Sequence, residues 1–323
     1  MSRLTARHVV TGGAGFIGSH LVDKLLARGD EVVAYDNLSN GKPAFLAQHV
    51  GNPRHHFVHA DVLDTADMSL AMKGADTVWH VAADPDVRTS GLRAESHVQQ
   101  NVIATLRVLE AMRVAGVKKI AFTSTSTVYG EANIMPTPED YAPMQPISLY
   151  GASKLGSESL ISAFCHTFDL QGIAFRFANI VGPRSTHGVT YDFYHKLKAS
   201  PKRLEILGDG RQKKSYCHVD DCVEGMLFAA QRFPERFDTF NVGSDDAIDV
   251  FDLARVAADA WKLRDVELVA TGAAGSGGWK GDVRMMALSN EKIKKLGWKP
   301  RHTSASAIRA TAESLAREFG AIA

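Results

Sequence analysis

The first half of the chain alternates short apolar runs with longer segments whose apolar residues recur at about 3.6-residue spacing. The short runs predict strands over residues 7–11, 31–35, 56–59, 77–81, 119–123 and 173–177. The longer segments predict helices over residues 16–28, 66–72, 94–115 and 148–168. Strands that alternate with helices in this way predict right-handed crossovers and a parallel sheet covered on both faces.

After about Asn179 this alternation ends, and long polar stretches separate the apolar runs. The pattern there predicts a helix near 220–231, a strand near 239–242 and a closing helix over 304–319. We therefore expect an α/β fold with two parts. Residues 1–178 would form a doubly wound parallel sheet, to which part of 216–245 returns, and residues 179–323 would form mainly a smaller α+β cap.

Composition and charge narrow the function classes. A chain of 323 residues suits two domains, and 37 basic against 36 acidic residues leave a net charge of +1. No run of Lys or Arg exceeds two, which disfavours nucleic acid as a partner. No stretch approaches the roughly 18 apolar residues of a membrane span, and residues 1–5 lack the apolar core of a signal peptide, so we expect a cytoplasmic protein.

The three cysteines indicate neither a disulfide framework nor a metal site. Cys165, Cys217 and Cys222 have no spacing typical of zinc ligands, and we expect each to be a small buried apolar residue. The histidines His55, His56 and His59 have no carboxylate or cysteine at ligand spacing, and we expect them in an edge strand or loop. The sequence predicts no metal site.

A glycine-rich turn lies between the first predicted strand and the first predicted helix. Gly12 permits a tight turn, Gly15 lets the backbone approach a pyrophosphate, and Gly18 lets the helix pack closely. Phe16 and Ile17 begin the helix, whose free N–H groups attract phosphates. This pattern predicts a Rossmann-type dinucleotide site.

An acidic residue at the end of the second predicted strand favours NAD over NADP. Asp36 lies 18 residues after Gly18, where a carboxylate accepts hydrogen bonds from the adenosine ribose and repels a 2′-phosphate. Asp36 and Asn37 also fit an ordinary turn, so a structural role stays open. Further loop residues fall where adenine and ribose contacts are expected, or are merely structural: Asp61, Val62, Val81, Ala82, Ala83 and Asn101.

A tyrosine and a lysine share one face of a predicted helix. Tyr150 and Lys154 have i, i+4 spacing, and a nearby ammonium is expected to lower the pKa of the phenol toward that of a general base. The hydroxyl-rich segment 123–127 ends the fifth predicted strand at the same edge of the sheet. Beside a nicotinamide site, this combination indicates alcohol–ketone redox chemistry.

Together these segments resemble the extended short-chain dehydrogenase/reductase family, and within it the nucleotide-sugar 4-epimerases. The matching segments span about two-thirds of the chain in the family's order: 11–20, 35–39, 78–83, 123–130, 150–154, 177–183 and 216–221. The resemblance implies tightly bound NAD, a UDP-hexose substrate favoured over other nucleotide sugars, and a homodimer formed through the helices 94–115 and 148–168.

The resemblance also implies roles for single residues. Tyr150 would be the base, Lys154 would hold it and the nicotinamide ribose, and Thr125 would bond the sugar O4. Asn179 would contact the sugar diphosphate. Lys214, Trp279 and Asp282 occupy positions where many epimerases bind the diphosphate, although Lys214 and Trp279 replace the arginines found there.

The two residues after Thr125 discriminate within the family. Related sugar 4,6-dehydratases carry Asp-Glu there, nucleotide-glucuronate decarboxylases carry a glutamate at the second position, and GDP-mannose 3,5-epimerases carry a cysteine. Here the residues are Ser126 and Thr127, which favours 4-epimerisation through a 4-keto sugar. A related reductase or oxidase and a non-catalytic NAD sensor remain alternatives. The nucleotide base and the sugar stay open.

Overall fold

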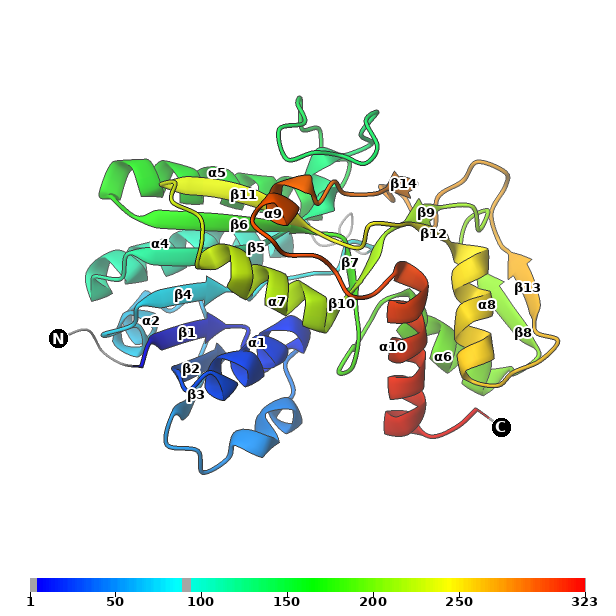
Figure 1. Ribbon diagram of the computed structural model, residues 1–323, viewed down its shortest axis with the longest axis horizontal. Helices are drawn as coiled ribbons and strands as arrows, with labels where there is room; N and C mark the ends of the chain where they lie inside the picture. Colours follow the sequence, from blue (N-terminus) through cyan, green and yellow to red (C-terminus); the bar gives the residue numbers. More distant parts are fainter. Residues whose placement is uncertain (1–4, 89–93, 323) are drawn as a thin grey trace. The chain divides into compact units, whose positions relative to one another are not determined.

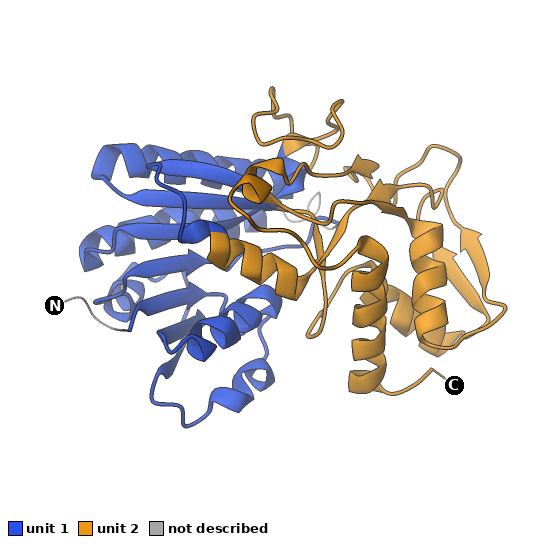
Figure 2. Cartoon of the chain, viewed as in Figure 1, with its two compact units in different colours: residues 1–128, 149–176, 229–240 blue, residues 129–148, 177–228, 241–323 orange. Residues whose placement is uncertain are grey.

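The computed structural model describes residues 5–88 and 94–322, so residues 1–4 of the N-terminal segment considered above lie outside the described residues (Figure 1). The chain forms two compact units (Figure 2). Unit 1 comprises residues 1–128, 149–176 and 229–240, and unit 2 comprises 129–148, 177–228 and 241–323. The division predicted from sequence places 1–178 and part of 216–245 together; in the structure 229–240 lies in unit 1, whereas 129–148 lies in unit 2.

A seven-stranded parallel sheet forms the centre of unit 1, in the order β11-β6-β5-β4-β1-β2-β3. Its strands are β1 (Arg7–Thr11), β2 (Glu31–Asp36), β3 (His55–His59), β4 (Thr77–His80), β5 (Lys119–Thr125), β6 (Gln171–Phe177) and β11 (Phe237–Val242). The predicted α/β fold is confirmed. The chain crosses from edge strand β3 to β4, so the strand order reverses between β1 and β4. Ligands of such sheets bind at the carboxyl ends of the strands beside this reversal.

Helices cover the two faces of this sheet. On one face lie α2 (Thr65–Ala71), α4 (Ala104–Ala115) and α5 (Leu149–Phe168), and α1 (Phe16–Ala27) covers the other (Figure 1). The core beneath the first group joins Met68, Leu109, Met112 and Ile161 to Val78 and Ile120 of the sheet. Because both faces are covered, the central strands consist largely of buried apolar residues.

The predicted helix 94–115 is not a regular α-helix. It consists of α3 (Ala94–His97), a π-helical segment η3 (Val98–Ile103) and α4. Single π turns inside helices are frequent at functional sites. Two short 3₁₀ helices were not predicted from the sequence: η1 (Pro43–His49) and η4 (Ser126–Tyr129).

Unit 2 combines helices with small sheets. Its helices are α6 (Val189–Ala199), α7 (Val219–Ala230, whose last two residues belong to unit 1), α8 (Val250–Ala260), α9 (Glu291–Lys295) and α10 (Ser304–Phe319). Strand β7 (Asn179–Val181) pairs with β10 (Tyr216–His218), and β8 (Arg203–Ile206) with β13 (Glu267–Ala270). The third sheet contains β12 (Ile248–Asp249), β9 (Lys213–Lys214) and β14 (Met285–Met286).

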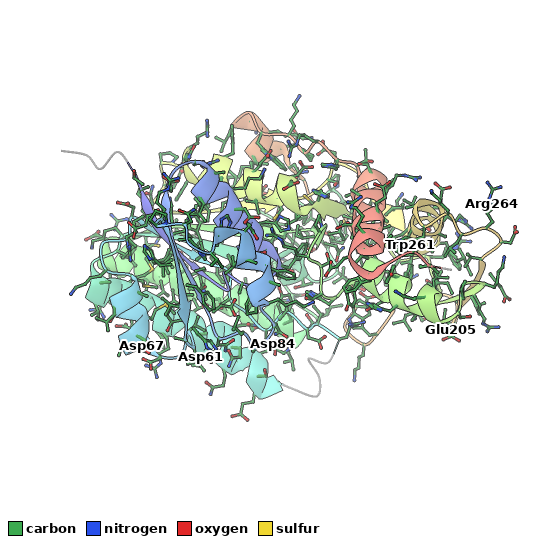
Figure 3. All side chains as sticks on the ribbon, turned by 90° about the horizontal axis from the view of Figure 1, so that it is seen from below. Asp61, Asp67, Asp84, Glu205, Trp261 and Arg264 are labelled. Carbon is green, nitrogen blue, oxygen red and sulfur yellow. The ribbon has the colours of Figure 1, made fainter. Side chains whose placement is uncertain are left out.

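The core of unit 2 is rich in aromatic residues. Trp261, labelled in Figure 3, follows α8 and donates from Nε1 to the carbonyl of Ala312 in α10 at 2.7 Å. Tyr194 of α6 packs against the same indole, with ring centroids 5.6 Å apart. These contacts join α6, α8 and α10 into one core.

The cysteines and the clustered histidines lie where the sequence led us to expect them. The three cysteines are buried and free. His55, His56 and His59 lie in β3, the edge strand, as expected. Across residues 5–88 and 94–322, no group of three or more His, Cys, Asp or Glu side chains is arranged to hold a metal ion. None of the described helices has both the length and the apolar character needed to cross a bilayer.

Candidate functional site

The glycine turn after β1 has the shape of a phosphate cradle. Gly12 has φ +69°, and a Cβ there would lie 2.8 Å from the backbone nitrogen of Ala82. A Cβ at Gly18 would lie 2.0 Å from the carbonyl oxygen of Gly12, so only glycine allows α1 to pack against the turn. The N-cap is Gly15, and the first turn of α1, which includes Phe16 and Ile17, contains no acidic residue. The first N–H groups of a helix have no acceptor within the helix, so this turn suits an anion such as a pyrophosphate.

The loop after β4 is fixed against this turn. The hydroxyl of Thr11 accepts hydrogen bonds from the backbone N–H groups of Val81 and Ala82, each at 3.2 Å. His80 contacts the hydroxyls of Thr11 at 2.8 Å and Thr105 at 3.1 Å. Burial lowers the pKa of His80 to about 3, with a smaller effect from the charge of Lys154, so its ring is neutral. His80 thus anchors the loop that begins with Val81, Ala82 and Ala83.

Asp36 is buried and already bonded to the backbone. Its carboxylate accepts from Ala14 N at 3.0 Å and from Leu38 N at 2.8 Å, the latter forming the turn that the sequence left open as an alternative. Burial raises the pKa of Asp36, while these two hydrogen bonds lower it. Each carboxylate oxygen has further lone pairs, so the group can still accept from ribose hydroxyls.

The ends of β2 and β3 are joined through side chains. Asn37 donates from Nδ2 to the carboxylate of Asp61 at 2.9 Å, and Asp61 also accepts from Leu63 N at 2.9 Å. Val62 between them is buried. In Figure 3, Asp61 and Asp84 lie along the same side of unit 1, consistent with their positions after β3 and β4. The predicted adenosine-contacting residues thus gather at the carboxyl edge of the sheet.

Asn101 lies in the π-helical segment and links three parts of unit 1. Its Oδ1 accepts from Asp84 N at 2.8 Å, and its Nδ2 donates to Ser153 Oγ at 2.9 Å. Its carbonyl oxygen accepts from the hydroxyls of Thr105 and Ser157. Asn101 is 2% exposed, and it fixes the position of α5 beside Lys154.

The structure brings Thr125, Tyr150 and Lys154 together within unit 1. Lys154 is 2% exposed, and its ammonium donates to the carbonyl of Thr123 at 2.7 Å. Thr125 is the last residue of β5, and its hydroxyl forms a hydrogen bond with the Tyr150 side chain. Thr125 Oγ1 also lies 3.1 Å from Thr127 Oγ1. A hydroxyl, a phenol and an ammonium therefore converge at the end of β5.

The pKa values in this cluster differ from the sequence prediction. Burial raises the pKa of the Tyr150 phenol well above its ordinary value; the hydrogen bond with Thr125 opposes this, and the charge of Asp84 adds to it. Burial lowers the pKa of Lys154 to about 7, and the charge of Glu158 opposes that shift. The prediction that Lys154 lowers the pKa of Tyr150 is wrong for the structure described, because burial outweighs the other influences on the phenol.

The candidate substrate residues other than Thr125 lie in unit 2. Lys214 forms an ion pair with Asp282, and its ammonium lies 5.1 Å from the centroid of the Trp279 ring. Asp282 also accepts from Gly278 N at 2.9 Å. Asn179 donates from Nδ2 to the carbonyl of Ser215 at 3.1 Å, next to Lys214 in the sequence. The structure thus brings Lys214, Trp279 and Asp282 into contact, and Asn179 is linked to the residue that follows Lys214.

Beside Lys154, Glu158 and Arg176 were missed in the sequence, and Ser124 was noted only as part of the hydroxyl-rich segment 123–127. Ser124, Glu158 and Arg176 form a buried cluster next to Lys154. The available signal was the position of Glu158, four residues after Lys154 on the same predicted helix. Its partner Arg176 lies on β6, and sequence spacing alone does not pair residues of different elements.

A parallel sheet with a glycine turn after its first strand is the architecture of dinucleotide-binding α/β proteins. The chain belongs to the NAD dependent epimerase/dehydratase family, whose model matches residues 8–243. The family is NAD-dependent.

Proteins similar to this chain differ from one another in activity. A UDP-glucose 4-epimerase of Mycolicibacterium smegmatis is 34% identical over 321 residues, covering 95% of this chain and 97% of that protein. A crystal structure of a UDP-galactose 4-epimerase has 44% identity and a TM-score of 0.86, covering 97% of this chain and 99% of that chain. A double mutant of the dTDP-glucose 4,6-dehydratase DesIV from Streptomyces venezuelae, with NAD and DAU bound, has 29% identity and a TM-score of 0.89, covering 97% of this chain and 98% of that chain.

Proposed function

We propose that this protein is a nucleotide-sugar 4-epimerase of the UDP-glucose/UDP-galactose type that keeps NAD tightly bound. The observation that supports this proposal most is the convergence of Thr125, Tyr150 and Lys154. Thr125 is followed directly by two residues with hydroxyl groups and not by a carboxylate. In the structure the hydroxyl of Thr127 bonds that of Thr125. Hydroxyl groups cannot supply the acid and base that a 4,6-dehydratase needs, whereas 4-epimerisation needs only a hydride acceptor and one proton relay.

NAD fits the residues of unit 1. The turn from Gly12 to Gly15, with Phe16, Ile17 and Gly18 at the start of α1, would hold the pyrophosphate, and Asp36 with Asn37 the adenosine ribose. Asp61 and Val62 would border the adenine, and Val81, Ala82, Ala83 and Asn101 would line the cofactor farther along the edge of the sheet. When bound, NAD supplies a reversible hydride acceptor.

The chain's own groups would handle the proton. Tyr150 as phenolate accepts the proton of the sugar C4 hydroxyl when the C4 hydride leaves, which gives a 4-keto sugar. Burial disfavours the phenolate form of Tyr150. The positive charge of Lys154 would offset part of this effect, and the hydroxyl of Thr125 would hold the sugar O4. After the sugar turns over, Tyr150 would give its proton back to O4, while C4 would accept hydride on its opposite face from the bound cofactor. The net reaction inverts C4 without consuming a reductant.

In unit 2, Asn179, Lys214, Trp279 and Asp282 would bind the nucleotide diphosphate. The ion pair of Lys214 with Asp282 limits how much of the lysine charge is available to phosphate, and lysine lacks the bidentate geometry of arginine. These residues do not identify the nucleotide base. UDP is favoured because two of the relatives described above are a UDP-glucose 4-epimerase and a UDP-galactose 4-epimerase.

The proposal is tested with purified protein and no added NAD. UDP-glucose and UDP-galactose are incubated separately, and the sugar anomeric signals are followed by NMR. Conversion from both sides supports a 4-epimerase with retained cofactor, and Tyr150→Phe is expected to lower kcat by roughly two to four orders of magnitude. A requirement for stoichiometric NAD(H) would instead indicate a reductase or oxidase. Bound NAD without conversion of these sugars contradicts the glucose/galactose assignment.

We also propose that the protein forms a homodimer through α5 and the helix that contains α4. On α5, the small residues Ala152, Ser159 and Ala163 are exposed, at spacings that place them on one face of the helix. On the neighbouring helix, Val98 is 50% exposed. Small residues let a second helix approach closely, which supports a helix-to-helix interface.

A further inference from the structure

One buried carboxylate next to the candidate catalytic residues has no part in the chemistry proposed above. Glu158 is 4% exposed and forms an ion pair with Arg176, which is also 4% exposed. Arg176 donates from Nη2 to Oε2 of Glu158 at 2.7 Å, and from Nε to Oε1 at 3.1 Å and to Oε2 at 3.2 Å. The hydroxyl of Ser124 donates to Oε1 of the same carboxylate. The carboxylate is thus held by two strands, since Ser124 lies on β5 and Arg176 on β6.

Glu158 continues the helical face that carries the tyrosine and the lysine. Tyr150, Lys154 and Glu158 follow one another at i, i+4 and i+8 on α5. They contact three consecutive residues of β5: Tyr150 bonds the Thr125 side chain, Lys154 the carbonyl of Thr123, and Glu158 the hydroxyl of Ser124. This face of α5 therefore contacts each of the last three residues of β5.

Among the described residues, the buried Glu158 carboxylate is paired with Arg176, and its charge also acts on Lys154. Burying a charge costs several kcal/mol, and a buried ion pair often stabilises a fold no more than apolar residues of similar volume do. A purely structural contact between α5 and β6 therefore has no need of charge. Lys154, by contrast, needs a compensating negative charge if it is to remain an ammonium in a buried site.

We propose that Glu158 is a positioning residue that acts through Lys154: held by Arg176 and Ser124, its negative charge keeps Lys154 protonated beside Tyr150. Arg176 moderates this effect, because it neutralises part of the charge that Lys154 experiences. The inference deepens the proposed function and rests on it for the catalytic role of Lys154, but the charge of Lys154 can be measured independently.

The other groups around Lys154 do not supply this charge. On β4, His80 is neutral, since burial lowers its pKa to about 3. On β5, the ammonium lies 4.5 Å from the centroid of the Phe122 ring and bonds the carbonyl of Thr123. On α5, the phenol of Tyr150 is neutral because burial raises its pKa. The negative charge of the Glu158 carboxylate opposes the fall in the pKa of Lys154 that burial causes.

The direct test is the titration of Lys154 in the folded full-length protein without sugar. Lysine labelled with ¹³C at Cε gives a signal for each lysine, and the signal of Lys154 is assigned by its absence in Lys154→Met. In Glu158→Gln, which keeps the size of the side chain and loses its charge, the titration midpoint is expected to fall by roughly one pH unit. An unchanged midpoint overturns the proposal.

Two further variants provide a second test and a control. Arg176→Gln removes the moderating cation and leaves a hydrogen-bond donor, so the midpoint is expected to rise; this result decides the question if Glu158→Gln fails to fold. A fall or no change in Arg176→Gln contradicts the proposal. Glu110→Gln is the matched control, because it removes a carboxylate from an ion pair with Arg113 at 2.7 Å on the more exposed side of α4. It is expected to leave the midpoint of Lys154 unchanged.

The kinetic readout separates this role from a structural one. The alkaline limb of the kcat profile is expected to move to lower pH in Glu158→Gln by the same amount as the Lys154 midpoint. A merely structural residue would lower kcat at every pH without moving the limb. If the protein epimerises neither sugar, the NMR titration still decides the role of Glu158, so failure of the proposed function and failure of this inference are distinguishable.

Discussion

At the scale of single residues, two buried carboxylates of this chain accept hydrogen bonds from backbone N–H groups. Asp36 accepts from Ala14 N and Leu38 N at the end of β2. Asp221, on α7 in unit 2, accepts from Arg301 N at 3.0 Å and His302 N at 2.9 Å, and from both of their side chains. The side chain of Asp221 is fully buried. A carboxylate with four such donors holds a distant part of the chain in place, which is a stability role that spacing in the sequence does not reveal.

Asp221→Asn is expected to lower the free energy of unfolding by about 2 kcal/mol at neutral pH, because the amide keeps one acceptor and loses the charge. Burial raises the pKa of Asp221, but the hydrogen bonds from His302 and Arg301 outweigh it, and the pKa is below its ordinary value of 3.8. The contribution is therefore complete above that value and is lost as pH falls through the lower pKa of the folded state.

Urea unfolding of both proteins at about pH 7 and about pH 3 measures this dependence. The difference between them should shrink at the lower pH, and a difference that stays constant would show that the charge of Asp221 contributes nothing. Asp259→Asn is the control, since Asp259 is 71% exposed in its pair with Arg309 and an exposed pair contributes little.

At the scale of elements, the hydrophobic pattern predicted the strands and helices of unit 1 well. Strands and helices alternate there, and each buries apolar residues at the regular spacing of its own type. The strand Arg7–Thr11 has the predicted bounds, and so does the helix Ser304–Phe319 of unit 2. The π-helical segment around Asn101 was not predictable, because its apolar periodicity resembles that of an ordinary helix. Helix α6 was missed as well, since it begins Val189-Thr190-Tyr191, and β-branched and aromatic residues are weak helix formers.

The close approach of α1 to the glycine turn at Gly18 can be tested by substitution. In Gly18→Ala the new Cβ would lie 2.0 Å from the carbonyl oxygen of Gly12, so the helix must move away from the turn. We expect a loss of about 1–3 kcal/mol in unfolding free energy and weaker NADH binding, measured by thermal unfolding and by NADH fluorescence.

The matched control is another glycine inside a helix. At Gly156 on α5 the nearest side-chain atom to a new Cβ is Val102 Cγ2 at 3.9 Å, so Gly156→Ala is expected to be neutral or to stabilise by up to about 1 kcal/mol. Equal effects of the two substitutions would mean that the close approach at Gly18 is unimportant.

At the scale of the whole molecule, local patterns predicted the fold class and missed the arrangement of the second unit. The strands β9, β12 and β14 each have two residues and pair across long stretches of chain, so no periodicity marks them. Residues 129–148 lie between two elements of unit 1 in the sequence, yet belong to unit 2. There Tyr129 donates to Asn241 Oδ1 at 2.8 Å, and Asn241 donates to the carbonyl of Thr137 at 2.9 Å. Such non-local contacts determine the units, and the order of residues does not.

The proposed homodimer gives the prediction for the whole molecule. Light scattering at micromolar concentration is expected to give twice the mass of the chain, and a sharp monomer mass would refute the dimer. Ala163→Arg places a long charged side chain on the exposed small-residue face of α5, where an interface would leave its charge desolvated and unpaired, so this variant is expected to be monomeric while remaining folded. Arg264→Glu, at an exposed position of unit 2 (Figure 3), changes the surface charge without touching that face and should remain dimeric. A dimer that persists in Ala163→Arg would place the interface on a different surface of the protein.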